Sequence, residues 1–342
     1  MTALALDPAW LAEALRAGRG FAHKRDIAEV MDHLAQRQGA QPVRAAQSGN
    51  GDDCAVLPTP QGEGHLLLAI EGMTPDFVAA NPWFAGYSAV VVNLSDVYAM
   101  GGRPLALVDA LWSLPEGPVE ALLDGMSCAA RRYRVPLVGG HSNLRSDRSL
   151  LAVAVLGHAR CLISSFEARP GDRLLMAVDL RGAYEEPFPF WNASTRAPEE
   201  RLREDLEVLP LLAEAGLCRA GKDISMAGAL GSALMLLECS GVGARIDLDA
   251  LPRPPGIATP AEFLRWLQAF PSYGFVLSVA SDQVAEVLAR FHARDLACAA
   301  IGQVDADPQV RIRSGGREAL LWDLAAEPFI TTREQPHAGT GD

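Results

Sequence analysis

Ser48-Gly49-Asn50-Gly51-Asp52-Asp53 is the stretch from which the organisation of the chain can be worked out. Glycine and aspartate are typical of turns, because glycine accepts unusual backbone angles and the aspartate side chain bonds to nearby backbone groups. The apolar run 65–71 follows it and has the length of a strand. We therefore expect Asp52 and Asp53 to lie on a loop beside a strand.

A further acidic residue lies within a predicted helix. Across residues 83–100 the apolar side chains recur at helical spacing, and Gly101-Gly102 with Pro104 supplies a stop signal. Asp96 interrupts this apolar helix, three residues after Asn93. Because an unpaired buried charge is costly, Asp96 is expected to have a partner.

The acidic residues form a candidate metal site if they converge. Asp223 stands just before another predicted helix. Converging carboxylates repel one another unless a cation neutralises them, and carboxylate oxygens favour magnesium or calcium over zinc. Taken singly, Asp52, Asp53, Asp96 and Asp223 also fit ordinary roles as loop or cap residues.

The remaining pattern alternates between helix and strand, which predicts a mixed α and β protein. Strands are predicted at 104–112, 135–138, 149–158, 174–178, 274–279 and 300–304, and helices at 118–134, 198–215, 225–239 and 282–294. A turn at 169–173 separates the two halves. We expect one domain over residues 1–164, a second over 165–330, and a disordered tail over 331–342.

Two further segments are candidate anion sites. Gly139 and Gly140 follow a short predicted strand, and glycines allow backbone N–H groups to approach an anion closely; a plain tight turn is the alternative. His141 is either a phosphate or substrate contact or a hydrogen-bonded structural histidine. Ser225 begins a predicted helix, whose first N–H groups can hold an anion.

One apparent nucleotide motif is rejected. Residues 216–223 nearly match the P-loop pattern, but Asp223 stands where the pattern needs a hydroxyl, and the segment follows a predicted helix instead of a strand. Asp223 is therefore interpreted as a metal ligand or a cap.

Composition excludes several classes of function. The 342 residues carry a formal net charge of −12, which disfavours binding to nucleic acid. No apolar stretch approaches the roughly 20 residues needed to cross a bilayer, so no membrane partner is expected. The six cysteines are widely spaced, without a metal or disulfide pattern, which favours a reducing cytoplasm.

Four motifs in order resemble those of one superfamily. They are Gly51-Asp52-Asp53-Cys54-Ala55, Asn93-Leu94-Ser95-Asp96, Gly139-Gly140-His141 and Lys222-Asp223-Ile224-Ser225. Together they are similar to motifs of the PurM-like superfamily, which contains aminoimidazole ribonucleotide (AIR) synthetase, thiamine monophosphate kinase, selenophosphate synthetase and HypE. The resemblance runs from about residue 20 to 325, and the segment 230–248 extends it into the C-terminal domain.

The resemblance implies an N-terminal α/β domain that pairs its sheet across a homodimer, a C-terminal α+β domain, and ATP with Mg²⁺ between them. It assigns magnesium to Asp52, Asp53, Asp96 and Asp223, with Glu71 as a further ligand and with Asp53 and Asp96 as the catalytic pair. The ATP and phosphate contacts it implies are Lys24, Gly49, Gly51, Asn93, Gly139, Gly140, His141 and Ser225. Lys24 also fits an ordinary surface lysine.

The sequence departs from its relatives at several positions. Glu71 stands where thiamine monophosphate kinase has an aspartate, and His141 follows the glycine pair where that kinase and HypE have aspartate. The N-terminal region lacks a reactive cysteine in a glycine-rich loop, so selenium chemistry is not supported, and the C-terminal cysteine of HypE is absent. The chain thus resembles a divergent, AIR-synthetase-like member.

The expected activity is ATP- and magnesium-dependent phosphorylation or activation of an unidentified small metabolite. Candidate substrate contacts are the aromatic residues Tyr184, Phe188, Phe190 and Trp191, which either stack on a substrate or pack the loop onto its domain. The alternative is a non-catalytic nucleotide-binding subunit, structural or regulatory, that acts through a partner protein.

Overall fold

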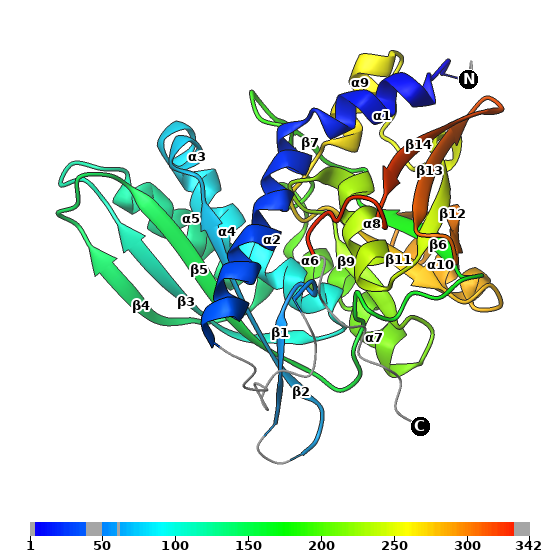
Figure 1. Cartoon of the computed structure of the whole chain (residues 1–342). Helices are drawn as coiled ribbons and strands as arrows, with labels where there is room; N and C mark the ends of the chain where they lie inside the picture. Colours follow the sequence, from blue (N-terminus) through cyan, green and yellow to red (C-terminus); the bar gives the residue numbers. More distant parts are fainter. Residues whose placement is uncertain (1–3, 39–49, 60–61, 332–342) are drawn as a thin grey trace.

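Two large β-sheets, each packed against helices, and one small two-stranded sheet make up the described chain (Figure 1). The computed structural model describes residues 4–38, 50–59 and 62–331, so Gly49 and the predicted tail beyond Thr331 lie outside the described residues. The helices are α1 (Pro8–Arg16), α2 (Arg19–Gln38), α3 (Pro75–Ala80), α4 (Pro82–Ala99), α5 (Val119–Tyr133), α6 (Glu199–Leu206), α7 (Val208–Glu214), α8 (Gly228–Cys239), α9 (Pro260–Leu267) and α10 (Val284–His292), with a short 3₁₀ turn at Leu248–Ala250.

The strands of the N-terminal half are β1 (Ala55–Pro58), β2 (His65–Met73), β3 (Arg103–Trp112), β4 (Leu137–Asn143) and β5 (Leu150–Ala159). Those of the C-terminal half are β6 (Arg173–Val178), β7 (Ala183–Glu185), β8 (Phe190–Asn192), β9 (Ala220–Asp223), β10 (Gly243–Asp247), β11 (Gly274–Val279), β12 (Ala297–Asp305), β13 (Gln309–Ser314) and β14 (Arg317–Asp323). The mixed α and β architecture predicted from the sequence is confirmed.

The first sheet has the order β1-β2-β5-β3-β4 and is antiparallel except for the pair β3–β4. Successive strand residues face opposite sides, so Leu67 and Ala69 are buried while Leu68 and Ile70 are exposed. The buried side joins the core formed with α4 and α5. One face of this sheet is therefore covered by helices, and the other presents apolar side chains outward.

The second sheet has the order β14-β13-β10-β12-β6-β11-β9, and its strands β6, β11 and β9 are buried on both faces. Along β6, Leu174 and Met176 belong to the core that contains α8, whereas Leu175 and Ala177 belong to the core that contains α7 and α10. Helix α2 runs across the boundary between the two sheets (Figure 1). No helix in the described part of the chain is both long and apolar enough to cross a membrane.

Close helix packing fixes the position of α4. A Cβ atom on Gly86 would lie 2.1 Å from the carbonyl oxygen of Leu122 in α5, and one on Gly125 would lie 2.0 Å from that of Trp83. Only glycine permits this approach. Helix α4 is consequently buried on nearly all sides, including at Asp96.

Three predicted elements differ from the structure. Gly139 and Gly140 do not form the tight turn given as the alternative, because β4 continues through them in parallel register with β3, and the side chains of this strand are exposed. The predicted helix 198–215 is two helices, since Pro210 lacks the N–H group that an unbroken helix would require. Ser225 precedes α8 instead of starting it.

Candidate metal and nucleotide site

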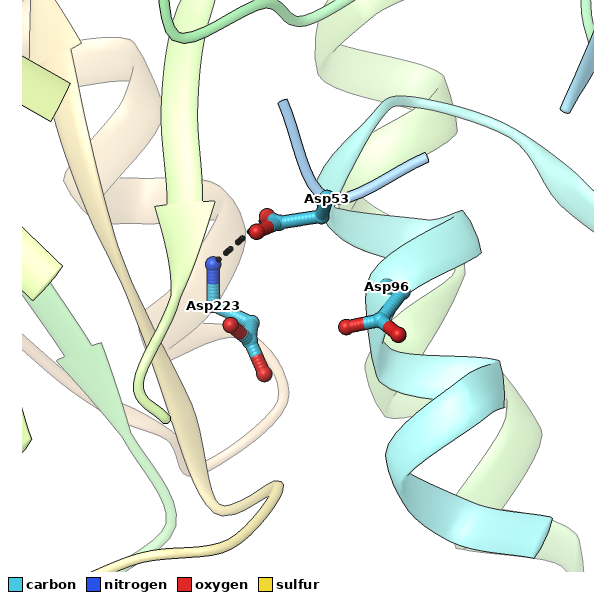
Figure 2. A group of neighbouring side chains, drawn as sticks. All are labelled: Asp53, Asp96 and Asp223. Atoms are coloured by element: carbon cyan, nitrogen blue, oxygen red, sulfur yellow. Dashed lines mark hydrogen bonds between the residues drawn. The ribbon is translucent and has the colours of Figure 1, made fainter. Parts of the chain in front are cut away.

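Three aspartates from three separate elements converge (Figure 2). Asp53 comes from the loop before β1, Asp96 from α4 and Asp223 from the end of β9. One carboxylate oxygen from each lies within 4.8 Å of the others. The backbone N–H of Asp223 donates to Asp53 Oδ2 at 3.1 Å, which ties the loop to the strand.

The environment of these carboxylates opposes their ionisation. Burial raises the pKa of Asp96 well above its usual range, and the charges of Asp223 and Glu71 raise it further. Burial, together with repulsion from Asp53, raises the pKa of Asp223 to about 8. Among the described residues Asp96 Oδ2 has no hydrogen-bond partner. A cation between the carboxylates would supply the missing partner and reverse these shifts.

Lys222 supplies a buried positive charge beside Asp53. Its ammonium group forms an ion pair with Asp53 Oδ1 and donates to the carbonyl oxygen of Gly51 at 2.9 Å. Burial is the largest single effect on the pKa of Lys222 and lowers it, but attraction to Asp53 and the hydrogen bond together raise it above its usual value. Lys222 therefore remains charged and holds Asp53 in place.

Two more acidic residues border the cluster. Asp52 accepts hydrogen bonds from Ser164 Oγ at 2.9 Å and from the N–H of Ser165 at 2.5 Å, and burial raises its pKa. Glu71 follows Ala69 by two residues in β2 and so projects toward the helix-covered side. The Glu71 side chain keeps contact with solvent, but the surrounding protein partly desolvates it and raises its pKa, while the charge of Lys24 opposes the shift.

The cluster opens into a cavity of about 300 Å³, within the size range of small-ligand sites. We call it the central cavity. Its described lining residues are Lys24, Ile27, Asn50, Gly51, Asp52, Asp53, Glu71, Gly72, Met73, Thr74, Phe77, Ser88, Val92, Asp96, Phe190, Lys222, Asp223, Ser225, Met226, Met235, Phe270, Pro271 and Ile330. The central cavity therefore brings together all five candidate metal ligands. It also contains four other predicted site residues, namely Lys24, Gly51, Ser225 and Phe190.

The donor set of the central cavity fits magnesium. It consists of carboxylate oxygens, which are hard ligands, and neither cysteine nor histidine lines the described wall. Asp96 Oδ2 and Ser225 Oγ are buried without hydrogen-bond partners in the described part of the chain. Buried polar atoms of this kind are uncommon unless a ligand or water completes them.

Four other predicted phosphate contacts lie outside the central cavity. Asn93 donates from its side chain to the carbonyl oxygen of Ala89 at 2.8 Å, within α4. Gly139, Gly140 and His141 lie on the exposed strand β4, where the His141 ring packs at 5.5 Å from that of Trp112. These three residues reach no acidic group of the cluster within the described chain.

Three predicted substrate residues also pack elsewhere. Phe188 stacks on Phe190, with 4.9 Å between the ring centroids, and is not among the described lining residues of the central cavity. Trp191 donates through Nε1 to the carbonyl oxygen of Asp179 at 2.8 Å and lies edge-on against Trp266. The Tyr184 ring lies beneath the guanidinium of Arg265, 3.9 Å from it. Their contacts match the packing alternative, whereas Phe190 faces the cavity.

Sequence reasoning missed Lys222, Phe77 and Phe270 as cavity residues. The usable signal for Lys222 was its position directly before the candidate ligand Asp223, because a lysine buried beside such a ligand needs a charged partner. Phe77 and Phe270 carried no comparable signal, since phenylalanine is common in any core.

Comparison with known proteins identifies the family. Sequence models of the AIR synthase related protein family match residues 51–159 as its N-terminal domain and 174–315 as its C-terminal domain. The uncharacterized protein sll0787 of Synechocystis is 46% identical over 315 residues, covering 91% of this chain and 94% of its own. The thiamine-monophosphate kinase of Synechococcus elongatus is 28% identical over 325 residues, covering 86% and 96%.

Solved structures share the fold. Thermotoga maritima PurL complexed with ATP superposes with a TM-score of 0.72 at 18% identity, over 96% of this chain and 53% of that one, so the chain spans about half the length of PurL. HypE in its complex with HypF gives a TM-score of 0.65 at 22% identity, over 85% and 98%. With both domain models matched in order, the chain belongs to the AIR synthase related protein family, a PurM-like family with ATP-using relatives.

Proposed function

We propose that this protein binds ATP with Mg²⁺ and uses it to phosphorylate or activate a small metabolite. The convergence of Asp53, Asp96 and Asp223 carries the proposal, because buried carboxylates that face one another need a bound cation. The relatives support ATP as the nucleotide, since PurL has been solved with ATP and another relative is named as a kinase.

Each residue of the site has a proposed part. Asp53, Asp96 and Asp223 would hold magnesium, with Asp52 and Glu71 at its border. Bound magnesium would neutralise charge on the triphosphate and orient it. Lys222 fixes Asp53, Lys24 offers a cation to phosphate, and the apolar wall excludes water. Positioning and charge neutralisation supply most of the rate in phosphoryl transfer, so no protein nucleophile is required.

We also propose that the protein is a cytoplasmic homodimer. The outer face of the first sheet exposes apolar side chains on adjacent strands, including Leu68, Ile70, Val108 and Leu156. A patch of this kind is typical of an interface. All six cysteines are free, as in a reducing compartment. The domain division near residue 164 agrees with the separation of the two sheets along the chain.

Asp96→Asn tests the site. We expect the variant to stay folded and to lose at least about 100-fold in affinity for magnesium with the non-hydrolysable ATP analogue AMPPCP, because loss of a supporting residue alone costs about 10–100-fold. Calorimetric titration measures this affinity. Unchanged affinity would place the metal elsewhere.

Turnover separates catalysis from the alternative. ADP formation that requires both magnesium and an added metabolite supports an enzyme. Tight ADP binding without turnover across a metabolite panel would instead favour a nucleotide-binding subunit that acts through a partner. This second candidate is supported by HypE, a structural relative that was solved in complex with another protein, HypF.

A further inference from the structure

The central cavity is lined by two unlike sets of residues. One is ionic and consists of Asp52, Asp53, Glu71, Asp96, Asp223, Lys24 and Lys222. The other is apolar and includes Phe77, Phe190, Phe270, Met73 and Ile330. A ligand that fills the cavity beside bound nucleotide therefore meets a large apolar surface.

Three phenylalanines form the rigid part of this apolar surface. The Phe190 ring lies 4.7 Å from Phe77 at 67° and 4.9 Å from Phe270 at 76°, which are edge-to-face arrangements. Phe77 and Phe190 are buried, and Phe270 is half-buried. A backbone bridge joins Phe190 to Phe270. Phe270 is thus held in place yet keeps ring surface for a ligand, and rings held in this way stack on planar groups at little entropic cost.

Beyond the lysine proposed above to contact the triphosphate, no cation on the described wall is left for an anionic group of the acceptor. Lys222 is paired with Asp53, and Lys24, which forms no ion pair among the described residues, is the cation offered to the triphosphate. Neither arginine nor histidine lines the described cavity. A phosphate group on the molecule that accepts the phosphoryl group would lie near several carboxylates and the triphosphate, with no positive protein group left to neutralise it. Its affinity for the cavity would therefore be lower than that of the phosphate-free molecule.

A second cavity of about 300 Å³ does carry arginines, namely Arg181, Arg196 and Arg201. It shares no described lining residue with the central cavity. The hollow between them, lined by Ser88 and Pro271 on one side and Asn192 on the other, has a volume of about 10 Å³. That is scarcely room for one water molecule, so a phosphate group of a ligand in the central cavity does not reach the arginines.

We propose that the central cavity takes a phosphate-free acceptor with a planar, apolar body, which stacks on Phe270 and turns a hydroxyl group toward the carboxylate cluster. This inference rests on the proposed phosphoryl transfer. The hydroxyl oxygen forms the new bond to the γ-phosphorus, the bond from that phosphorus to the β–γ bridging oxygen breaks, ADP leaves with the electron pair, and the hydroxyl proton passes to solvent. The proposed substrate carries no phosphate, unlike the substrate named in thiamine-monophosphate kinase.

Matched pairs of probes test the proposal. Pyridoxine with pyridoxine phosphate, and thiamine with thiamine monophosphate, are titrated calorimetrically into the full chain saturated with magnesium and AMPPCP. We expect the phosphate-free member of at least one pair to bind about tenfold or more tightly than its ester. Phe270→Leu should weaken that binding about three- to tenfold, the range of one lost ring contact.

Trp83→Leu is the control, because this half-exposed ring on α4 stacks on Tyr87 and lines none of the cavities above. It should leave probe affinity unchanged. Tighter binding of the esters, no binding of any phosphate-free probe, or equal affinity in Phe270→Leu and the parent would each overturn the proposal. If the parent chain does not bind magnesium with AMPPCP, the proposed function is overturned instead. Failure of this inference and failure of the proposed function can therefore be told apart.

Discussion

Lys222 and Asp53 form an ion pair across the boundary between the two sheets, with both side chains almost wholly buried. Lys222 is in β9 and Asp53 lies before β1, 169 residues earlier. The pair neutralises one carboxylate of the acidic cluster without a metal ion.

Lys222→Met should destabilise the metal-free protein by about 3–5 kcal/mol, because it leaves a buried carboxylate unpaired. Magnesium should raise the melting temperature of this variant more than that of the parent, since the cation then replaces the lost charge. Thermal unfolding with and without magnesium measures both effects. Lys24→Met removes the other cavity lysine, which forms no ion pair among the described residues, and should cost much less. Equal losses in the two variants would contradict the role of the pair.

The stabilisation by magnesium should grow with pH. With its pKa at about 8, Asp223 in the metal-free folded chain keeps a proton that the unfolded chain releases near its usual value of 3.8. The folded state thus binds more protons across this window, and the free energy of unfolding falls as pH rises through it. Magnesium requires the ionised carboxylate, so the shift in melting temperature should be larger at about pH 9 than at about pH 6. A shift independent of pH would place the cation away from Asp223.

Gly86→Ala should destabilise the protein by about 1–3 kcal/mol, because the added methyl group would collide with the backbone of α5. Denaturant unfolding measures the change. Gly139→Ala is the control, since a Cβ atom there meets nothing within 4 Å. A similar cost at both positions would contradict the close packing of α4 on α5.

Ile70→Asp should convert the proposed homodimer to a monomer, because it puts a charge in the centre of the apolar outer sheet face. Light scattering after gel filtration gives the mass of each species. Leu211→Asp, on α7 and also exposed, should leave the mass unchanged. A parent protein that is monomeric at every concentration would remove the homodimer from the proposed function.

Local signals predicted the elements that carry the aspartates. The glycine-rich segment placed Asp53 on a loop, and the apolar periodicity of residues 83–100 predicted α4 to within one residue at each end. The mixed architecture followed from the alternation of helix and strand patterns, and the family followed from the ordered motifs; both predictions are confirmed.

Features that depend on distant pairing were not predictable in this way. The strand character of Gly139 and Gly140 comes from parallel pairing with β3, about 30 residues away, and no local pattern encodes it. Phe270 enters the cavity through its bridge to Phe190, far along the chain. Pro210 indicated the break before α7, but the continuous helical periodicity of residues 198–215 led to the prediction of one unbroken helix.

The three aspartates of the cluster also determine when the site can form. The nascent chain exposes Asp53 and Asp96 long before Asp223, which is synthesised 170 residues after Asp53. Contacts this distant in sequence form late, so the magnesium proposed for this cluster should not nucleate folding of the first half. Bound magnesium should therefore lower the rate of unfolding and leave the rate of folding almost unchanged.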